Sequence, residues 1–329
     1  MYILTIMLLF YNLIRSNALR APVLMYRGSK QRFVQRMSFS AHSNNKYANF
    51  RQSIKLHSIQ NNDSFNDDSL YLNGLENAQN AVKILAQKNR TWNRLSPIVT
   101  MAVQNLSNDQ RGIAGIVDVG CDHGLLSIAL AASGSFGQVI GSDVSHRALT
   151  DGALNFEQKV NEVLNREGIE QKLAVDFRIG DGLNCLNEGE VNGGICIAGM
   201  GVDTMLSILN FSTLQMLRCP TLYLQPPTSK PRRLMELYRP LQINGWQLID
   251  EHISYVKNRW YITSAFNSSD TNDFTEQIRL PGHFLSQKDS EKKEFQRYID
   301  FHMKWMNDDM SRGQLSRDEE IWRASYITQ

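Results

Sequence analysis

One short stretch does most to limit the folds open to this chain. Residues 116–130 read IVDVGCDHGLLSIAL, in which an apolar run meets Asp118, passes through Gly120 and Gly124, and continues with helical spacing. A buried strand, a glycine-containing turn and a helix in this order begin an alternating strand–helix fold with a parallel sheet. Ligands of such sheets bind beyond the carboxyl ends of the strands, so this loop is the expected binding site.

Strand patterns recur further along the chain at the spacing of an alternating fold. After the strand at 115–119, we predict buried strands at 138–142, 174–179, 194–198 and 221–225, with helices between them. Two more strands, 246–255 and 260–266, are separated by Lys257-Asn258 and predict an antiparallel hairpin. The pattern predicts an α/β domain with a seven-stranded, mostly parallel sheet.

Helical patterns flank and connect these strands. Residues 79–106 have helical propensity with an expected break near Pro97, and residues 148–166 form a long amphipathic pattern. Beyond Pro281-Gly282 the chain is charged and helical, and Gly313 divides it into two predicted helices. One face of this tail is expected to carry Phe295, Ile299, His302, Trp305 and Met306. We therefore predict a domain at 76–280 and a C-terminal helical hairpin domain at 281–329.

The first 75 residues have the composition of a targeting leader and a linker. Tyr2–Ile14 is uncharged and mostly apolar, and the triplet SNA offers a cleavage position after Ala18. Residues 19–62 are rich in Arg, Ser and Asn and contain no acid, as transit peptides do. The order of a signal-like segment (1–18) and a transit-like one (19–62) predicts delivery to a plastid. A mitochondrial presequence or a misassigned start codon is the alternative, and 63–75 is predicted to be a polar linker.

Charge is unevenly distributed along the chain. Residues 1–62 hold nine of the 35 Lys and Arg but none of the 33 Asp and Glu, so the remainder is net acidic. A nucleic acid would therefore need a local basic patch on this body. The four cysteines form no CxxC pair, which favours free thiols over a disulfide framework or a zinc site.

The glycine loop lacks the features of a phosphate site. Its spacing is GxxxG with Asp122 inside, not GxGxxG, and a carboxylate would repel a pyrophosphate. An acidic loop suits a cationic ligand such as S-adenosylmethionine, whose amino-acid end Asp118 and Asp122 would bind. Asp143 follows the second strand and is placed to accept the ribose hydroxyls, and Asp181 with Gly182 follows the third strand for the adenine amine.

The predicted donor site also takes in the end of the fourth strand. Its full set is Asp118, Gly120, Asp122, Gly124, Asp143, Asp181, Gly182, Ala198, Gly199, Met200 and Gly201. Each acid alone could equally be a helix cap or a turn residue. A metal at Asp122-His123 is disfavoured because no second ligand pair has useful spacing.

The residues after the fourth strand indicate the kind of methyl acceptor. Ala198-Gly199-Met200-Gly201 offers no polar side chain, and Gln225-Pro226-Pro227 comes after the fifth strand instead. This favours an acceptor such as a ring nitrogen, whose own lone pair attacks and which needs positioning more than deprotonation.

Together these motifs resemble a known family. VDVGCDHGLLSIAL, GDGLNCLNEGEVNGGICIAGMG, LYLQPP and NGWQLIDE are similar, in order and spacing, to the bacterial tRNA (adenine(22)-N1)-methyltransferases, over roughly residues 92–310. The resemblance implies a Rossmann-like methyltransferase domain with a helical C-terminal domain, and methyl transfer from S-adenosyl-L-methionine to N1 of an adenine in the D-arm region of tRNA. Three residues depart from the family pattern: Cys121 for Ser, Val202 for Gly, and Pro227 for Asn.

We assign roles on this basis. Asp122, positioned by His123, would stabilise the cationic methylated base, although Asp122 serving only the donor is an equal alternative. Gln225 would hold the adenine edge. Residues predicted to contact RNA are Lys230, Arg232, Arg233, Lys292 and Arg297. The competing interpretations are a catalytically inactive RNA-binding protein of the same fold, and a methyltransferase for another RNA or a small molecule.

Overall fold

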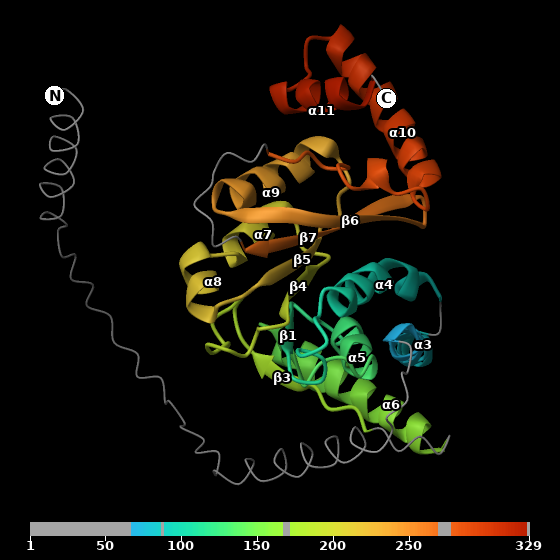
Figure 1. Cartoon of the computed structure of the whole chain (residues 1–329), viewed down its shortest axis with the longest axis vertical. Helices are drawn as coiled ribbons and strands as arrows, with labels where there is room; N and C mark the ends of the chain where they lie inside the picture. Colours follow the sequence, from blue (N-terminus) through green and yellow to red (C-terminus); the bar gives the residue numbers. More distant parts are fainter. Residues whose placement is uncertain (1–66, 87–88, 167–171, 269–277, 328–329) are drawn as a thin grey trace, which may run out of the picture. The chain divides into compact units, whose positions relative to one another are not determined.

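A computed structural model describes residues 67–86, 89–166, 172–268 and 278–327 of the chain. The predicted signal-like and transit-like segments lie outside these residues. The sheet has seven strands in the order β3-β2-β1-β4-β5-β7-β6 (Figure 1). Their bounds are β1 Gly115–Val119, β2 Gln138–Asp143, β3 Asp176–Ile179, β4 Gly194–Ala198, β5 Thr221–Gln225, β6 Trp246–Val256 and β7 Arg259–Ser268.

Strand direction divides the sheet into two parts. β1 to β5 are parallel to one another, whereas β7 pairs antiparallel with both β5 and β6. The turn at Lys257 and Asn258 has positive φ at both residues, as the tightest hairpins require. Strand order reverses between β1 and β4, so a crevice for a ligand is expected at their carboxyl ends. The predicted seven-stranded α/β fold is confirmed.

Helices cover both faces of the sheet. On one face, α3 (Asp67–Ala86), α4 (Asn89–Gln104) and α5 (Leu125–Ala132) form a core with Ile116 and Tyr223 (Figure 1). The other face carries α7 (Val202–Ile208), α8 (Phe211–Leu217) and α9 (Pro231–Ile243). A single-turn π-helix, Ala148–Ala153, leads into α6 (Leu154–Arg166) beside β2 and β3.

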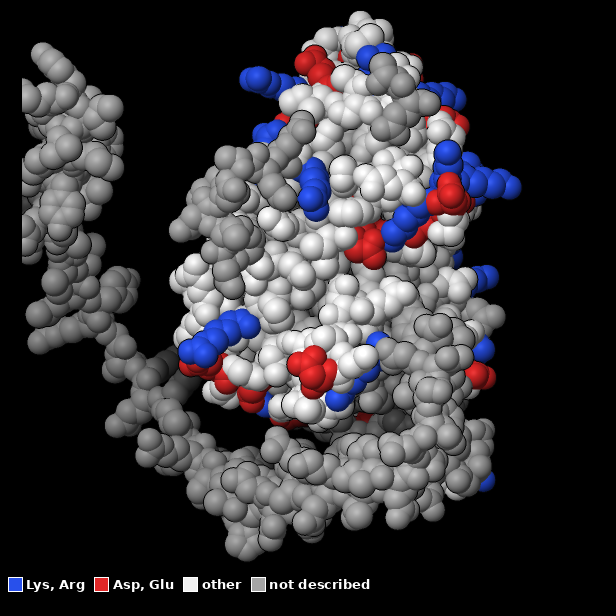
Figure 2. Space-filling model, in the orientation of Figure 1, with Lys and Arg blue, Asp and Glu red and all other residues white. Residues whose placement is uncertain are grey.

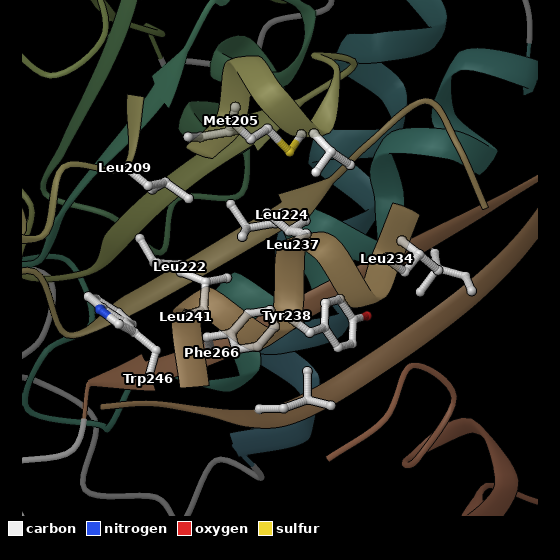
Figure 3. Close-up of a cluster of buried hydrophobic side chains, with 14 of the residues drawn as sticks. Met205, Leu209, Leu222, Leu224, Leu234, Leu237, Tyr238, Leu241, Trp246 and Phe266 are labelled. Atoms are coloured by element: carbon white, nitrogen blue, oxygen red, sulfur yellow. The ribbon is translucent and has the colours of Figure 1, made fainter. Parts of the chain in front are cut away.

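The second face holds the larger core. Leu234, Leu237 and Leu241 recur along one side of α9 and pack on Leu222 and Leu224 of β5 (Figure 3). All five are fully buried. Burial of each leucine contributes about 1.5–3 kcal/mol, which fixes α9 on the sheet and β5 in register with its neighbours.

The C-terminal helices α10 (Lys292–Ser311) and α11 (Arg317–Ile327) follow a short 3-10 turn, Leu285–Gln287. They do not form a core of their own. Tyr298 and Trp322 are fully buried in the same cluster as α9, and Trp322 Nε1 donates to the Pro281 carbonyl at 2.9 Å. The two predicted helices are confirmed, with Gly313 at φ 66° between them, but they pack as part of the sheet domain.

Three sequence-based predictions are wrong. The polar linker expected at 63–75 gives way to α3 at Asp67, whose Gly74 backs directly onto the Ser133 carbonyl. Pro97 does not interrupt its helix, because α4 buries Ile98 and Val99 fully and this offsets the roughly 3 kcal/mol cost of an internal proline. Trp305 is 57% exposed and lies off the buried face of α10. Within the described residues, no helix combines the length and apolarity needed to cross a bilayer.

Candidate functional site

The glycine loop between β1 and α5 has an unusual backbone. Gly120, Asp122 and Gly124 all have positive φ, of 72°, 49° and 72°. The amides of Gly120 and Cys121 donate to the Ser142 carbonyl of β2, at 2.8 and 2.9 Å. Asp is among the few side chains that tolerate this conformation, so the loop presents a carboxylate where most residues would be strained.

The loop after β4 covers the glycine loop. A Cβ built on Gly120 would lie 1.8 Å from the terminal methyl group of Met200. The predicted segment Ala198–Gly201 is therefore brought next to the predicted donor loop. Gly120 is required here both for its backbone conformation and for this close approach.

His123 and Asp122 form a pair at the centre of the loop. The His123 Nδ1 lies 2.8 Å from Asp122 Oδ2, and both side chains are more than half exposed. A Cβ on Gly152 would lie 3.3 Å from the imidazole, so the π-helical turn makes room for this ring. Phe156 borders it, with ring centroids 5.9 Å apart. The predicted positioning of Asp122 by His123 is supported by this direct contact.

The π-helical turn was not predicted from the sequence, which indicated a regular helix at 148–166. The turn also lies close to Gly124: a Cβ added there would be 2.9 Å from the Cβ of Ala153, and 3.0 Å from the Phe177 ring of β3. Only glycine fits at this position. Single π turns within helices occur frequently at functional sites. Its sequence signal is weak, since the helical period is preserved on both sides.

Asp143 lies at the end of β2, as predicted, and its carboxylate is fixed by backbone amides. Oδ2 accepts from the Asp122 amide at 3.0 Å, and Oδ1 accepts from the Ser145 amide at 2.8 Å. Each oxygen keeps a further lone pair, because a carboxylate has about four acceptor sites. This arrangement can accept a pair of hydroxyl groups from a ribose.

Asp181 and Gly182 follow the end of β3, the strand next to β2. The Gly180 amide donates to the Asp143 carbonyl at 3.0 Å, which joins the two strand ends. Asp181 is exposed, and Gly182 has φ 58° with its α-carbon facing Ile208 of α7. These two residues and Asp143 lie at adjacent strand ends, which is the juxtaposition predicted for the donor.

Asp118 requires a correction. It lies within β1, is 3% exposed, and its Oδ2 accepts from the Ser127 amide at 3.1 Å and the Ser127 hydroxyl at 2.7 Å. Burial raises the pKa of Asp118 to about 6, against the opposing effect of those two bonds. Asp118 thus anchors the first turn of α5 under the loop and offers no exposed carboxylate to a ligand.

Gln225 also requires a correction. It is the last residue of β5 and is 1% exposed. Its Nε2 donates to the Arg94 carbonyl and to Thr263 Oγ1, both at 2.7 Å. The predicted grip on an adenine edge is therefore wrong, since the side chain ties α4 to β5 and β7.

Arg94 of α4 was missed by sequence reasoning. Its guanidinium lies over the Tyr261 ring, 6.0 Å from the centroid, and its Nη1 would be 3.6 Å from a Cβ on Gly199. The residue is therefore at the ends of β4 and β5. An arginine within a segment of helical propensity gives no sequence signal of its own.

Most of the residues predicted to contact RNA are paired with acids. Arg232 Nε lies 3.1 Å from Glu236, Arg233 contacts Glu236 and lies 2.6 Å from Asp203, and Arg297 lies 2.7 Å from Glu294. Lys230 and Lys292 are exposed at the starts of α9 and α10. Figure 2 shows Lys and Arg interspersed with Asp and Glu on one face of the molecule.

The site thus has a definite chemical character. Acids at the ends of two neighbouring strands flank a loop of positive-φ residues, at the carboxyl edge of a Rossmann-like sheet. Within the described residues, no group of three or more His, Cys, Asp or Glu could hold a metal ion. The arrangement fits a methyl-donor site: Asp143 has acceptor capacity for ribose hydroxyls, and the Asp122 amide ties its carboxylate to the glycine loop.

Comparison with known proteins gives the class. Residues 101–263 match the family described as a methyltransferase domain, so the chain carries such a domain. The predicted cofactor, S-adenosyl-L-methionine, is confirmed with it. A protein of Mycoplasma genitalium, provisionally named a tRNA methyltransferase, is 28% identical over 148 residues, which are 45% of this chain and 58% of that protein. This bears out the resemblance to tRNA methyltransferases, over less than two thirds of the relative's length.

Solved structures resemble this chain at low identity. The B. subtilis M1A22 tRNA methyltransferase TrmK is 18% identical, with a TM-score of 0.44, over 70% of this chain and 92% of its own. TrmK of M. capricolum, in complex with S-adenosyl-homocysteine, is 17% identical, with a TM-score of 0.43, over 64% and 85%. Magnesium protoporphyrin IX methyltransferase from Synechocystis is 16% identical, with a TM-score of 0.41, over 68% and 94%. Neighbours with such different substrates indicate no acceptor for this chain.

Proposed function

We propose that this protein transfers a methyl group from S-adenosylmethionine to N1 of an adenine in tRNA, with adenine 22 in the D-arm region as the target. The observation that carries the proposal is the Asp122 carboxylate, which is exposed on left-handed backbone within the donor loop and contacts His123. The sequence motifs support the family assignment, and the name of the curated relative supports tRNA as the substrate class.

The donor half of the site is made by residues that follow strands β1 to β4. S-adenosylmethionine, when bound, supplies an electrophilic methyl group on a sulfonium centre. Asp143 would hold its ribose and Asp181 with Gly182 its adenine, while the Gly120 and Met200 loops would enclose its amino-acid end. Asp118 has no direct part in this binding, because Ser127 takes up its buried carboxylate.

The acceptor chemistry needs a fixed negative charge more than a base. Adenine N1 has its own lone pair, and its methylated product carries a positive charge. A preorganised carboxylate stabilises charge that develops during reaction at no further cost of reorientation. Asp122 meets this requirement because its backbone amide is bonded to Asp143 and its carboxylate to His123. The target base must leave its stacked position to reach the site, as bases do in other base-modifying enzymes.

Methylation of defined transcripts tests this function. The full chain would be incubated with methyl-labelled donor and unmodified tRNA transcripts that carry adenine or guanine at position 22. We expect label only in the adenine transcript, with a primer-extension stop at that base, because N1-methyladenine blocks pairing. Label that is equal in both transcripts would contradict the proposed position and favour another RNA site. Donor binding without any RNA methylation would favour a small-molecule acceptor or an inactive RNA-binding protein.

We further propose that residues 1–75 direct the protein to a plastid. The proposal rests on their composition alone, with a signal-like segment before a transit-like one. A fluorescent protein fused behind these residues is expected to enter a plastid in cells that contain one. Mitochondrial or diffuse signal from the same fusion would contradict it.

A further inference from the structure

We infer that Arg94, with Tyr261 beneath it, binds a phosphate of the acceptor nucleotide. The juxtaposition that carries this inference is a guanidinium, without an acidic partner among the described residues, at the carboxyl ends of β4 and β5. In the sheet order, β1 separates these strand ends from the donor acids at β2 and β3. The inference rests on the proposed function for the identity of the acceptor, and it assigns a substrate-binding role to a residue outside the glycine loop.

The backbone of Arg94 is held firmly at the sheet edge. Its carbonyl accepts from Gln225 Nε2 at 2.7 Å, and the same amide donates to Thr263 Oγ1 at 2.7 Å. Gln225 is the last residue of β5, and Thr263 lies in β7, so one buried side chain joins helix and sheet at this point. A site built on such fixed elements places its side chain precisely enough to select a ligand.

The guanidinium is oriented but not neutralised. Its Cζ lies over the Tyr261 ring at 6.0 Å from the centroid, which is the range of a cation–π contact. Its Nη1 approaches the α-carbon of Gly199, where a Cβ would be 3.6 Å away and where φ is 78°. Among the residues that the structure describes, none forms an ion pair or a hydrogen bond with this guanidinium, so its donors remain available to a ligand.

Pairing elsewhere in the chain shows how distinctive this is. Arg178 is clamped between Asp176 and Glu190, and Arg233 between Asp203 and Glu236. The charges of those two arginines are balanced by acids, whereas Arg94 has an aromatic ring and a glycine as neighbours. Its positive charge nevertheless acts on the site: burial raises the pKa of the Asp118 carboxyl, and the Arg94 guanidinium opposes part of that rise.

Acidic and basic side chains lie at different strand ends of the site, which separates the donor side from the proposed acceptor side. Asp143 and Asp181 lie at the ends of β2 and β3, and Arg94 lies beside the ends of β4 and β5. A nucleotide is anionic at its phosphate and neutral at its base, so Arg94 would anchor the phosphate while the base turns toward Asp122. Guanidinium suits this role because its planar fork matches two phosphate oxygens.

The test uses adenosine 5′-monophosphate and adenosine as probes, so it does not depend on finding the correct tRNA. With the full chain saturated with S-adenosylhomocysteine, ligand-observed NMR titration would give the dissociation constant of each probe. We expect the monophosphate to bind about tenfold more tightly than adenosine, the scale of a charge-assisted contact. Arg94→Ala should abolish this preference, and Arg94→Lys should keep only part of it.

Arg90→Ala is the matched control, since Arg90 is exposed one helical turn earlier on α4. It should retain the preference, and all variants should retain wild-type affinity for S-adenosylhomocysteine. The inference is overturned if the wild type shows no preference, if Arg94→Ala keeps it, or if Arg94→Ala loses S-adenosylhomocysteine binding instead. Methylation of tRNA by the wild type decides the proposed function separately, whichever result the two probes give.

Discussion

His123 Nδ1 lies 2.8 Å from Asp122 Oδ2, on a loop where Asp122 has a left-handed backbone. The contact fixes the direction of an exposed carboxylate that would otherwise rotate freely. Nothing in the spacing of the sequence requires two adjacent side chains to meet, because neighbours in an extended segment point apart. The left-handed residue turns them toward each other, and Gly152 leaves the space that the imidazole fills.

Asp122→Asn is expected to slow methyl transfer. The substitution keeps shape and removes charge, so the single-turnover rate should fall about 10- to 100-fold if the carboxylate stabilises the cationic product. His123→Phe should cause a smaller loss, because the carboxylate remains but loses its fixed orientation. Rapid-quench measurements with labelled donor check both variants. Asp109→Asn, in the turn before β1 at the other end of that strand, is the control and should have no effect.

An unchanged single-turnover rate for Asp122→Asn, with weaker donor binding, would assign Asp122 to the donor alone. The sequence leaves both roles open. Calorimetric titration with S-adenosylhomocysteine separates the two roles, because an electrostatic role in the reaction leaves donor affinity nearly unchanged.

Gly120→Ala is expected to impair donor binding beyond its effect on stability. Its φ of 72° costs a non-glycine residue about 1–2 kcal/mol, and the added Cβ would also displace the Met200 side chain. Gly112→Ala provides a matched comparison, since Gly112 has φ 70° but no atom within 4 Å of the built Cβ. Both variants should lose similar unfolding free energy in urea, but only Gly120→Ala should weaken S-adenosylhomocysteine binding. Equal donor affinity in the two would show that Met200 simply moves aside.

Glu251 is expected to make stability decrease with rising pH. It is fully buried, accepts from the amides of Gly282 and Phe284 and from Tyr238, and burial raises the pKa of Glu251 from 4.5 to about 7. Because the folded-state pKa is raised, its contribution is complete below about pH 4.5 and is lost as pH rises through about 7. A shift of this size corresponds to about 3 kcal/mol in all.

Urea unfolding between pH 6 and 8 follows the last part of the stability loss due to Glu251. Asp118, whose pKa burial raises to about 6, adds a decrease of the same sign at lower pH, so this window favours Glu251. Glu251→Gln should flatten the decline in unfolding free energy, although it also lowers stability at every pH by removing a hydrogen-bond acceptor. Glu236→Gln, at a partly exposed carboxylate, should leave the slope unchanged. A wild-type slope in Glu251→Gln would refute the assignment.

The strands that the sequence predicted well are bounded by residues that end a strand locally. Strands β1, β4 and β5 have the predicted bounds, because each is a short apolar run followed directly by a glycine or a proline. The start of α3 was missed because Asp67-Asp68-Ser69 resembles a linker in composition, while its helical fate is decided by packing of Gly74 and Leu75 against the domain. Tertiary contact overrides local propensity in such segments.

The sequence predicts which residues of the candidate site lie at strand ends, but not which of their side chains are buried. Asp143 and Asp181 lie where the alternation places them, because the carboxyl ends of parallel strands share one edge. Asp118 and Gln225 were assigned to ligands from position alone, and both prove to be buried hydrogen-bonding residues. The sequence shows which residues end a strand, but not whether a serine or a neighbouring helix takes up their polar atoms.

Arg233 provides the sharpest test of RNA binding at α9, because it is held by Asp203 at 2.6 Å and by Glu236. A phosphate that contacts Arg233 must compete with these acids. Asp203→Asn is therefore expected to strengthen tRNA binding about two- to threefold, whereas Arg232→Ala with Arg233→Ala should weaken it. The double variant should also flatten the slope of log affinity against log salt by about one to two units, because fewer counterions are released. Anisotropy titrations at several salt concentrations measure both effects.

Arg218→Ala, which breaks the exposed pair with Glu188 before β5 begins, is the control and should change neither affinity nor slope. If Asp203→Asn and the double variant both bind tRNA as the wild type does, these arginines are purely structural and the polyanion lies elsewhere.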